Sequence, residues 1–156
     1  MTLTDPLVEH VLGRAMVARL ATVSTSGRPH VNPNYFLVDG SCLWLGTTTG
    51  TLAARNVAAN PAVQVLLEDE RDPTNGLAVR ITGAAALRTE SDLLREYKLR
   101  NARKYFRSFR GLLMSASHFH RLFLTSKYLS TTDPTSHHCV IEVEPTRIEI
   151  LRLSTR

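Results

Sequence analysis

Cysteine, aromatic residues and long apolar runs are all scarce in this sequence. Its two cysteines, Cys42 and Cys139, form no CxxC motif and no His/Cys spacing of the kind that binds zinc, so we expect no metal site. Both lie inside apolar runs, as buried thiols of a reducing cytoplasm would. No run approaches the ~18 apolar residues of a membrane-spanning helix. The start of the chain, MTLTDPLVEH, lacks a basic region followed by an apolar one, which argues against a secretory signal. We therefore expect a cytoplasmic protein without membrane contact.

The composition fits one domain over residues 1–156. Hydrophobic residues make up 43% of the chain and charged residues 21%, which is enough apolar material for a packed core. Much of the positive charge behind the net charge of +5 lies in one basic stretch. This stretch could attract an anion, a nucleotide or an acidic partner, but we favour the simpler interpretation of a solvated helix face. It comprises Arg88, Arg95, Lys98, Arg100, Arg103, Lys104, Arg107, Arg110 and Arg121.

The pattern of apolar and turn residues predicts a mainly β chain of about seven strands. Asp39-Gly40, between two of them, is a strong hairpin signal. Hairpin turns between successive strands favour an antiparallel closed sheet over a doubly wound parallel one. The predicted strands span residues 16–25, 29–38, 41–47, 62–69, 76–88, 139–145 and 147–153, and the fifth is expected to bend near Gly83.

Short helices complete the prediction. The first has Thr4 or Asp5 as its cap and is expected to stop at Gly13, and the third begins with a Ser91 or Asp92 cap. The predicted helices span residues 4–14, 52–60 and 91–106, and part of 110–130 also has helical character.

Two smaller features receive structural interpretations. Asp69 forms an acidic cluster with Glu68 and Glu70 at a predicted strand end, where we expect solvated charges. Trp44 alternates with leucines in a predicted strand, which indicates a core or dimer contact.

The segment GTTTGT, residues 46–51, lies between a predicted strand and a predicted helix. The first turn of a helix carries unpaired N–H groups and a partial positive charge, so it favours an anion. Arg55 would project from the same helical face as Thr51 and could reach that anion. The alternative is that Thr49 or Thr51 merely caps the helix while the other threonines suit a strand end. The hydroxyls in question belong to Thr47, Thr48, Thr49 and Thr51.

The order of motifs over residues 8–88 resembles the pyridoxamine 5'-phosphate oxidase-like, FMN-binding split-barrel proteins. The motifs are a LATV strand, a GRPHVNP turn and strand, a DG hairpin, a strand–helix turn ending in AARN, and NPAVQV. CVIEVEPTRIEIL resembles the closing strands, whereas residues 89–135 match poorly. The resemblance implies an antiparallel split β-barrel of six to seven strands, of Greek-key type, with short peripheral helices. It also implies a homodimer with cofactor bound in clefts between the two chains.

The resemblance further implies two cofactor-binding segments. The phosphate would be held at the strand–helix turn by Thr47, Thr48, Thr51 and Arg55. The strand that contacts the flavin ring corresponds to His30, Val31, Asn32, Pro33 and Asn34. This chain departs from the family at Ala53, where many members carry lysine or arginine. Arg19 or Arg80, from neighbouring strands, could substitute for that charge.

These features favour an FMN-dependent oxidoreductase that acts on a small organic acceptor. No Ser-His-Asp or Cys-His arrangement can be argued from spacing, and no catalytic residue is assigned, because a flavin carries the hydride itself. One alternative is a reductase that uses the deazaflavin coenzyme F-420, whose phosphate and acidic tail would suit residues 95–110. Another is a non-catalytic flavin-binding protein. Nucleic-acid binding by the basic stretch and a ligand role for His30 rank below these.

Overall fold

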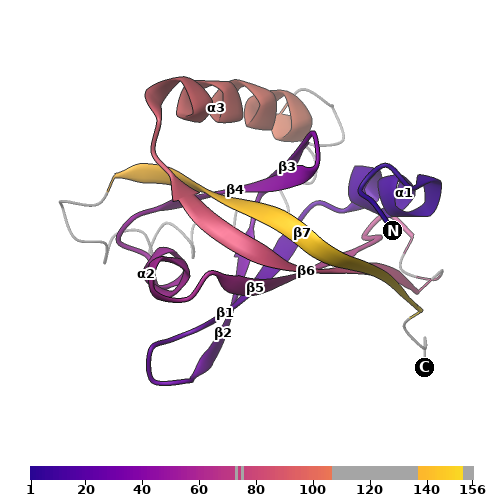
Figure 1. Ribbon diagram of the computed structural model, residues 1–156. Helices are drawn as coiled ribbons and strands as arrows, with labels where there is room; N and C mark the ends of the chain where they lie inside the picture. Colours follow the sequence, from indigo (N-terminus) through magenta and orange to yellow (C-terminus); the bar gives the residue numbers. More distant parts are fainter. Residues whose placement is uncertain (73, 75, 107–136, 153–156) are drawn as a thin grey trace.

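The computed structural model describes residues 1–72, 74, 76–106 and 137–152, which form seven β-strands and three α-helices (Figure 1). The chain is therefore mainly β, as the sequence predicted. In chain order the elements are α1 (Pro6–Arg14), β1 (Ala18–Val23), β2 (Pro29–Asn34), β3 (Phe36–Asp39), β4 (Cys42–Thr48), α2 (Leu52–Ala59), β5 (Ala62–Glu68), β6 (Leu77–Arg88), α3 (Ser91–Phe106) and β7 (His138–Arg152).

All seven strands belong to one antiparallel sheet with the order β2-β1-β5-β6-β7-β4-β3. The jumps from β1 to β5 and from β7 to β4 are crossovers of the Greek-key kind. The sheet curls until β2 approaches β4, where the Asn34 side chain donates a hydrogen bond of 3.1 Å from Nδ2 to the carbonyl of Gly46. The predicted split β-barrel is confirmed.

Alternating side chains along the strands fill the interior of the curled sheet. Fully burying one such aliphatic or aromatic side chain contributes roughly 1.5–3 kcal/mol of transfer free energy. Helices α1 and α2 close this core with apolar residues such as Val11 and Val57. Its largest fully buried side chains include Phe36, Leu20, Leu43, Leu45, Leu67, Ile81 and Ile141.

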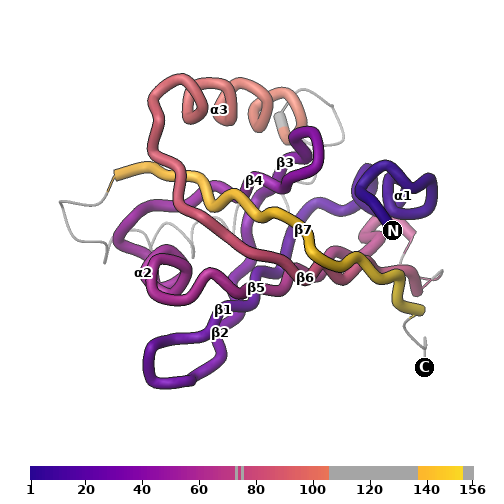
Figure 2. Tube along the Cα trace, in the orientation of Figure 1, coloured from indigo at the N-terminus to yellow at the C-terminus, as the bar shows by residue number. Residues whose placement is uncertain are grey.

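Helix α3 covers the opposite face of the sheet, over β3, β4 and β7 (Figure 2). Trp44 is buried there, which confirms its predicted core position, and its Nε1 donates a 2.9 Å hydrogen bond to Glu142. The Arg100 guanidinium lies 5.4 Å from the centre of the Trp44 ring and bonds Asp39 at 2.6 Å. The predicted solvated face is thus confirmed for exposed Arg95, Lys98 and Arg103, whereas Arg100 and Lys104 turn toward the strands.

Two predicted strand boundaries are wrong. The run 29–38 is divided at Tyr35 into β2 and β3, which lie at opposite ends of the sheet order. The two closing strands are one continuous strand, β7, because a β-bulge at Thr146 absorbs the irregularity at Pro145. The bend predicted near Gly83 is confirmed by the register shift opposite this bulge. A Cβ on Gly83 would collide with the carbonyl oxygen of Glu144, so the close approach requires glycine.

The helices follow their predicted spans, with differences at the ends. Helix α1 continues through Gly13 to Arg14, and it ends because the backbone of Ala15 is extended. The carbonyl of Glu90 accepts the first α3 bond, from the Leu94 N–H, so Glu90 rather than Ser91 or Asp92 takes the cap position.

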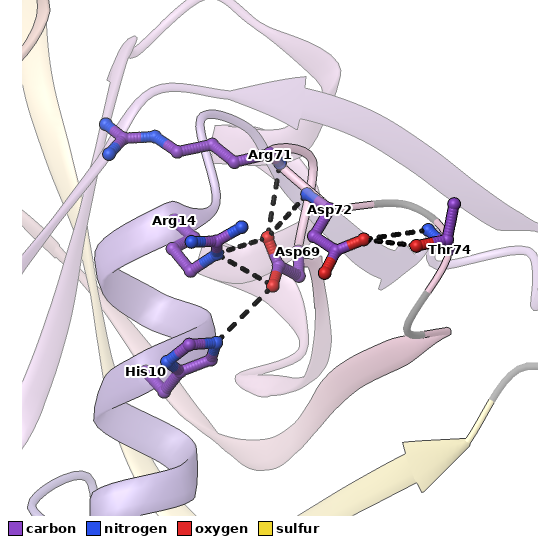
Figure 3. Close-up of polar contacts among 6 residues, drawn as sticks. All are labelled: His10, Arg14, Asp69, Arg71, Asp72 and Thr74. Carbon is purple, nitrogen blue, oxygen red and sulfur yellow. Dashed lines mark hydrogen bonds and ion pairs between the residues drawn. The ribbon is translucent and has the colours of Figure 1, made fainter.

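Asp69 corrects the prediction of a solvated acidic cluster, because its side chain has no exposed surface. The Nε of Arg14 on α1 lies 2.8 Å from both carboxylate oxygens, and the N–H groups of Arg71 and Asp72 donate to Oδ1 at 3.2 and 3.1 Å (Figure 3). His10 adds a contact of 3.6 Å. This buried charge therefore joins α1 to the segment that follows β5.

The remaining predictions concern the cysteines, membrane contact and the chain beyond residue 106. Cys139 is buried and Cys42 half-buried, and neither forms a disulfide. None of the helices in the described ranges is long and apolar enough to cross a membrane. The helical character predicted within 110–130, and the basic residues Arg107, Arg110 and Arg121, lie outside the described residues.

Candidate functional site

The threonine turn, residues 47–51, connects β4 to α2 and is held by its own hydroxyl groups. Thr51 occupies the N-cap position of α2, and its Oγ1 accepts a 3.2 Å hydrogen bond from the Ala54 N–H. The same hydroxyl donates to the Thr48 carbonyl at 2.9 Å and lies 2.9 Å from the hydroxyl of Thr47. One donor and two acceptor sites are then all used. The capping role considered from the sequence is confirmed for Thr51.

Other groups of this turn keep free hydrogen-bonding capacity. Across the described part of the chain, the N–H groups of Gly50, Leu52 and Ala53 have no hydrogen-bond acceptor. Thr48 is buried, yet its Oγ1 also lacks a partner there. Thr49 differs, because its N–H and Oγ1 both bond the backbone of His137. Unpaired N–H groups at a helix start are suited to an anion.

Arg55 lies one turn into α2 and is exposed. Within the described residues its guanidinium has no ion-pair or hydrogen-bond partner, although its backbone N–H bonds the Thr51 carbonyl. It is also the one charged residue in the α2 sequence LAARNVAA. A free guanidinium beside unpaired N–H groups makes this end of α2 electropositive.

The side chains of β2 divide into two faces. One face carries the less exposed side chains, which alternate along the strand with exposed ones. These residues are His30, Asn32 and Asn34. They face the same side of the sheet as the β1 residues with which they pair, Thr22, Leu20 and Ala18 respectively. Asn34 bonds Gly46 through Nδ2, but its Oδ1 and the Nδ2 of Asn32 are buried without a partner in the described structure. We call Asn32, Asn34 and Thr48 the seam, because they carry unpartnered buried atoms on β2 and β4, the strands that Asn34 joins at Gly46.

The other predicted residues lie on the outer face of the sheet. Val31 is 63% exposed, and Pro33 beside it is exposed as well. Arg19 lies opposite Pro33 and pairs with Glu68 at 3.3 Å, while Arg80 pairs with Glu149 at 2.9 Å. The structure therefore brings β2 and β4 together at Asn34 and Gly46. It places Val31, Pro33, Arg19 and Arg80 on the opposite side.

Tyr97 belongs to this site although no sequence pattern pointed to it. Its hydroxyl accepts a 3.0 Å hydrogen bond from the Gly46 N–H and donates to the Tyr35 carbonyl at 3.3 Å. Burial raises the pKa of Tyr97 to about 12, so the hydroxyl stays neutral and keeps its proton for this bond. Tyr97 lies 51 residues from Gly46 in the sequence, and no local pattern connects them.

No cluster of three or more His, Cys, Asp or Glu side chains that could hold a metal occurs in the described ranges. The arrangement that does occur is a strand–helix turn with free N–H groups, an unpaired arginine and a seam with unpaired amide and hydroxyl groups. Such a site can bind an anion at one end and a polar, flat group along the seam.

Comparisons with known proteins agree with this architecture. The curled antiparallel barrel defines a split-barrel protein, and residues 4–151 match the family model described as pyridoxamine 5'-phosphate oxidase. The chain therefore belongs to the pyridoxamine 5'-phosphate oxidase family. No curated protein matches it.

Solved structures with the same fold are described as proteins of different function. A candidate pyridoxamine 5'-phosphate oxidase from Listeria innocua is 21% identical with a TM-score of 0.64, and the alignment covers 93% of this chain and 95% of that one. An F420 reductase is 25% identical with a TM-score of 0.62, covering 90% and 94%. A heme binding protein from Mycobacterium smegmatis is 20% identical with a TM-score of 0.60, covering 94% of this chain and 52% of that one.

Proposed function

We propose that this chain is an oxidoreductase that binds FMN along the seam and transfers hydride to a small organic acceptor. The observation that carries the proposal is the group of buried polar atoms without partners: Asn32 Nδ2, Asn34 Oδ1 and Thr48 Oγ1. Buried polar groups are normally hydrogen-bonded, so a ligand with donors and acceptors at these points would remove a desolvation cost. Family membership supports the same class of cofactor.

The residues of the threonine turn fit a phosphate. The N–H groups of Leu52 and Ala53 can donate to it, and Arg55 can add a charge-assisted bond. Because Ala53 contributes no charge of its own, Arg55 carries the side-chain contribution from α2. Thr51 is occupied as a cap, so its hydroxyl is not expected to bind phosphate directly.

When bound, FMN would supply a ring that accepts and donates hydride. The protein would then bind the cofactor and orient it. Asn32 and Asn34 would hold the polar edge of the ring by hydrogen bonds, and Arg55 would hold the phosphate. A reversible hydride transfer also needs a small substrate beside the ring, and the described residues do not identify it.

We also propose a homodimer formed through the outer face of β1, β2 and β5. Exposed Val31 and Pro33 lie there, and Arg19 separates Pro33 from half-buried Leu66. This exposed surface supports association of two copies of the chain.

The first experiment is purification of the native protein, followed by an absorption spectrum and mass spectrometry of any released ligand. Flavin absorption bands together with the mass of FMN are expected. Addition of NAD(P)H without oxygen should bleach the flavin in an enzyme and leave it oxidised in a non-catalytic carrier. A haem spectrum, or a colourless protein that also fails to bind added FMN and F-420, would reject the proposal.

Coenzyme F-420 is the second candidate. It is supported by the 25% identity to an F420 reductase and by the exposed cations Arg95, Lys98 and Arg103 on α3, which would suit an acidic tail. The mass of the released ligand separates the two cofactors. In titrations, the double variant Arg95→Glu/Lys98→Glu should weaken binding of F-420 and leave binding of FMN unchanged.

A further inference from the structure

Lys104 is held in unusual surroundings for a lysine. Its Nζ lies 3.4 Å from the centre of the Phe36 ring and 5.2 Å from that of Tyr105. Its hydrogen bond, of 3.2 Å, goes to the Phe36 carbonyl. No carboxylate of the described residues lies within ion-pair distance of Nζ. The amine therefore has lost hydration without gaining a counter-ion.

These surroundings favour the neutral amine. Burial and, to a smaller extent, the charge of nearby Arg71 lower the pKa of Lys104 to about 8, while Glu70 opposes the shift. The Phe36 ring and carbonyl attract the ammonium form, but they replace only part of the lost hydration. A neutral lysine amine is a nucleophile toward carbonyl groups.

The nearby side chains also suit an aromatic molecule. Tyr35 and Tyr105 have ring centres 4.5 Å apart, with planes tilted by 49°. Tyr35 and Lys104 are only partly buried, so this pair of residues is reachable from solvent. Rings in such arrangements attract further rings by burial and by edge-to-face contact.

We propose that Lys104 is a covalent binding site for aromatic aldehydes, which its amine captures reversibly as imines. The Nζ lone pair attacks the carbonyl carbon and forms the C–N bond. The two amine protons leave with the carbonyl oxygen as water, so no oxidant or reductant is consumed. The reaction at Lys104 does not depend on any cofactor.

The test uses the wild-type full chain, 4-formylbenzoate as probe and sodium cyanoborohydride to trap imines as secondary amines. The sequence contains three lysines, Lys98, Lys104 and Lys127, so peptide mass spectrometry can quantify each of them. Exposed Lys98, on the same helix, is the internal control. At pH 7 we expect labelling of Lys104 to be at least about tenfold faster than labelling of Lys98, because the lowered pKa leaves a larger fraction of Lys104 neutral, which outweighs its lower basicity.

Two further results decide the proposal. The labelling rate at Lys104 should level off as the pH passes about 8. The variant Arg71→Glu changes an exposed side chain and places a negative charge near Lys104, so it should slow labelling there severalfold without affecting Lys98. Labelling of Lys104 that is no faster than that of Lys98, or a rate unchanged in Arg71→Glu, overturns the proposal.

Discussion

At the scale of single residues, Asp69 depends on groups from two separate segments. Arg14 reaches it from α1, 55 residues away, while the N–H groups of Arg71 and Asp72 reach it from the following loop (Figure 3). Each partner offsets part of the cost of burying the carboxylate.

Asp69→Asn should lower the free energy of unfolding by about 3 kcal/mol, because it leaves Arg14 without its buried counter-charge. Urea unfolding followed by circular dichroism measures this change. The control is Asp72→Asn, since the Asp72 carboxylate bonds only Thr74 within the described residues and its substitution should cost under about 1 kcal/mol. Equal effects of the two substitutions would contradict the role given to Asp69.

The lowered pKa of Lys104 predicts that the stability of the protein depends on pH. Its pKa is lowered from 10.5 to about 8 in the folded chain, so between these values the unfolded chain binds more protons. The folded state is then penalised below pH 8, and the penalty disappears as pH rises toward 10.5. Relative to Lys104→Met, the wild-type protein should gain about 2 kcal/mol of unfolding free energy between pH 7 and pH 10. Urea titrations at several pH values test this, and a difference independent of pH would contradict it.

Local sequence could not reveal these residues. Glu68, Asp69 and Glu70 look alike in the sequence, and only the approach of α1 decides that Asp69 is the buried one. Lys104 belongs to a basic helical stretch, and its burial follows from packing against β3. The threonine cap of the turn was easier to predict, because a cap acts within one helical turn.

At the scale of elements, the contact between α3 and β4 requires glycine at position 46. A Cβ added to Gly46 would lie 2.5 Å from the hydroxyl oxygen of Tyr97. By contrast, Gly13 lies in α1, and a Cβ added there would meet nothing within 4 Å.

Gly46→Ala should therefore destabilise the protein by about 2 kcal/mol through overpacking, because Tyr97 must move and lose its bond to the Gly46 N–H. Gly13→Ala should stabilise it by about 0.5–1 kcal/mol through helix propensity. Thermal unfolding of the two variants measures both changes in stability and their opposite signs. A Gly46→Ala protein as stable as the wild type would show that α3 does not pack against β4 in this way.

The strands and helices themselves were largely predictable from the alternation of apolar and polar residues, from hairpin signals and from helix caps. The break at Tyr35 was not, because its cause is tertiary: Asn34 turns to bond Gly46, while the Tyr35 carbonyl bonds Tyr97. The continuity of β7 through Pro145 was also unpredictable, since it depends on a bulge that packs against Gly83 on another strand.

At the scale of the whole molecule, one half of the outer sheet face is covered by α3 and the half around β1 and β2 carries exposed apolar residues. If two copies associate there, as proposed, Val31→Asp should weaken the dimer at least tenfold by burying a charge. Leu99→Asp is the control, because Leu99 is 58% exposed on α3. Analytical ultracentrifugation measures both, and a monomeric wild-type protein would refute the dimer.

The measurement that tests the central claim most directly is a comparison of FMN and riboflavin binding by the wild type and Arg55→Ala. The two ligands differ by the phosphate, which we place at the start of α2. The wild type should bind FMN roughly 10–100-fold more tightly than riboflavin, and Arg55→Ala should remove most of that preference while leaving riboflavin affinity unchanged. Equal affinity of the wild type for both ligands, or a preference for FMN that survives Arg55→Ala in full, would contradict the account.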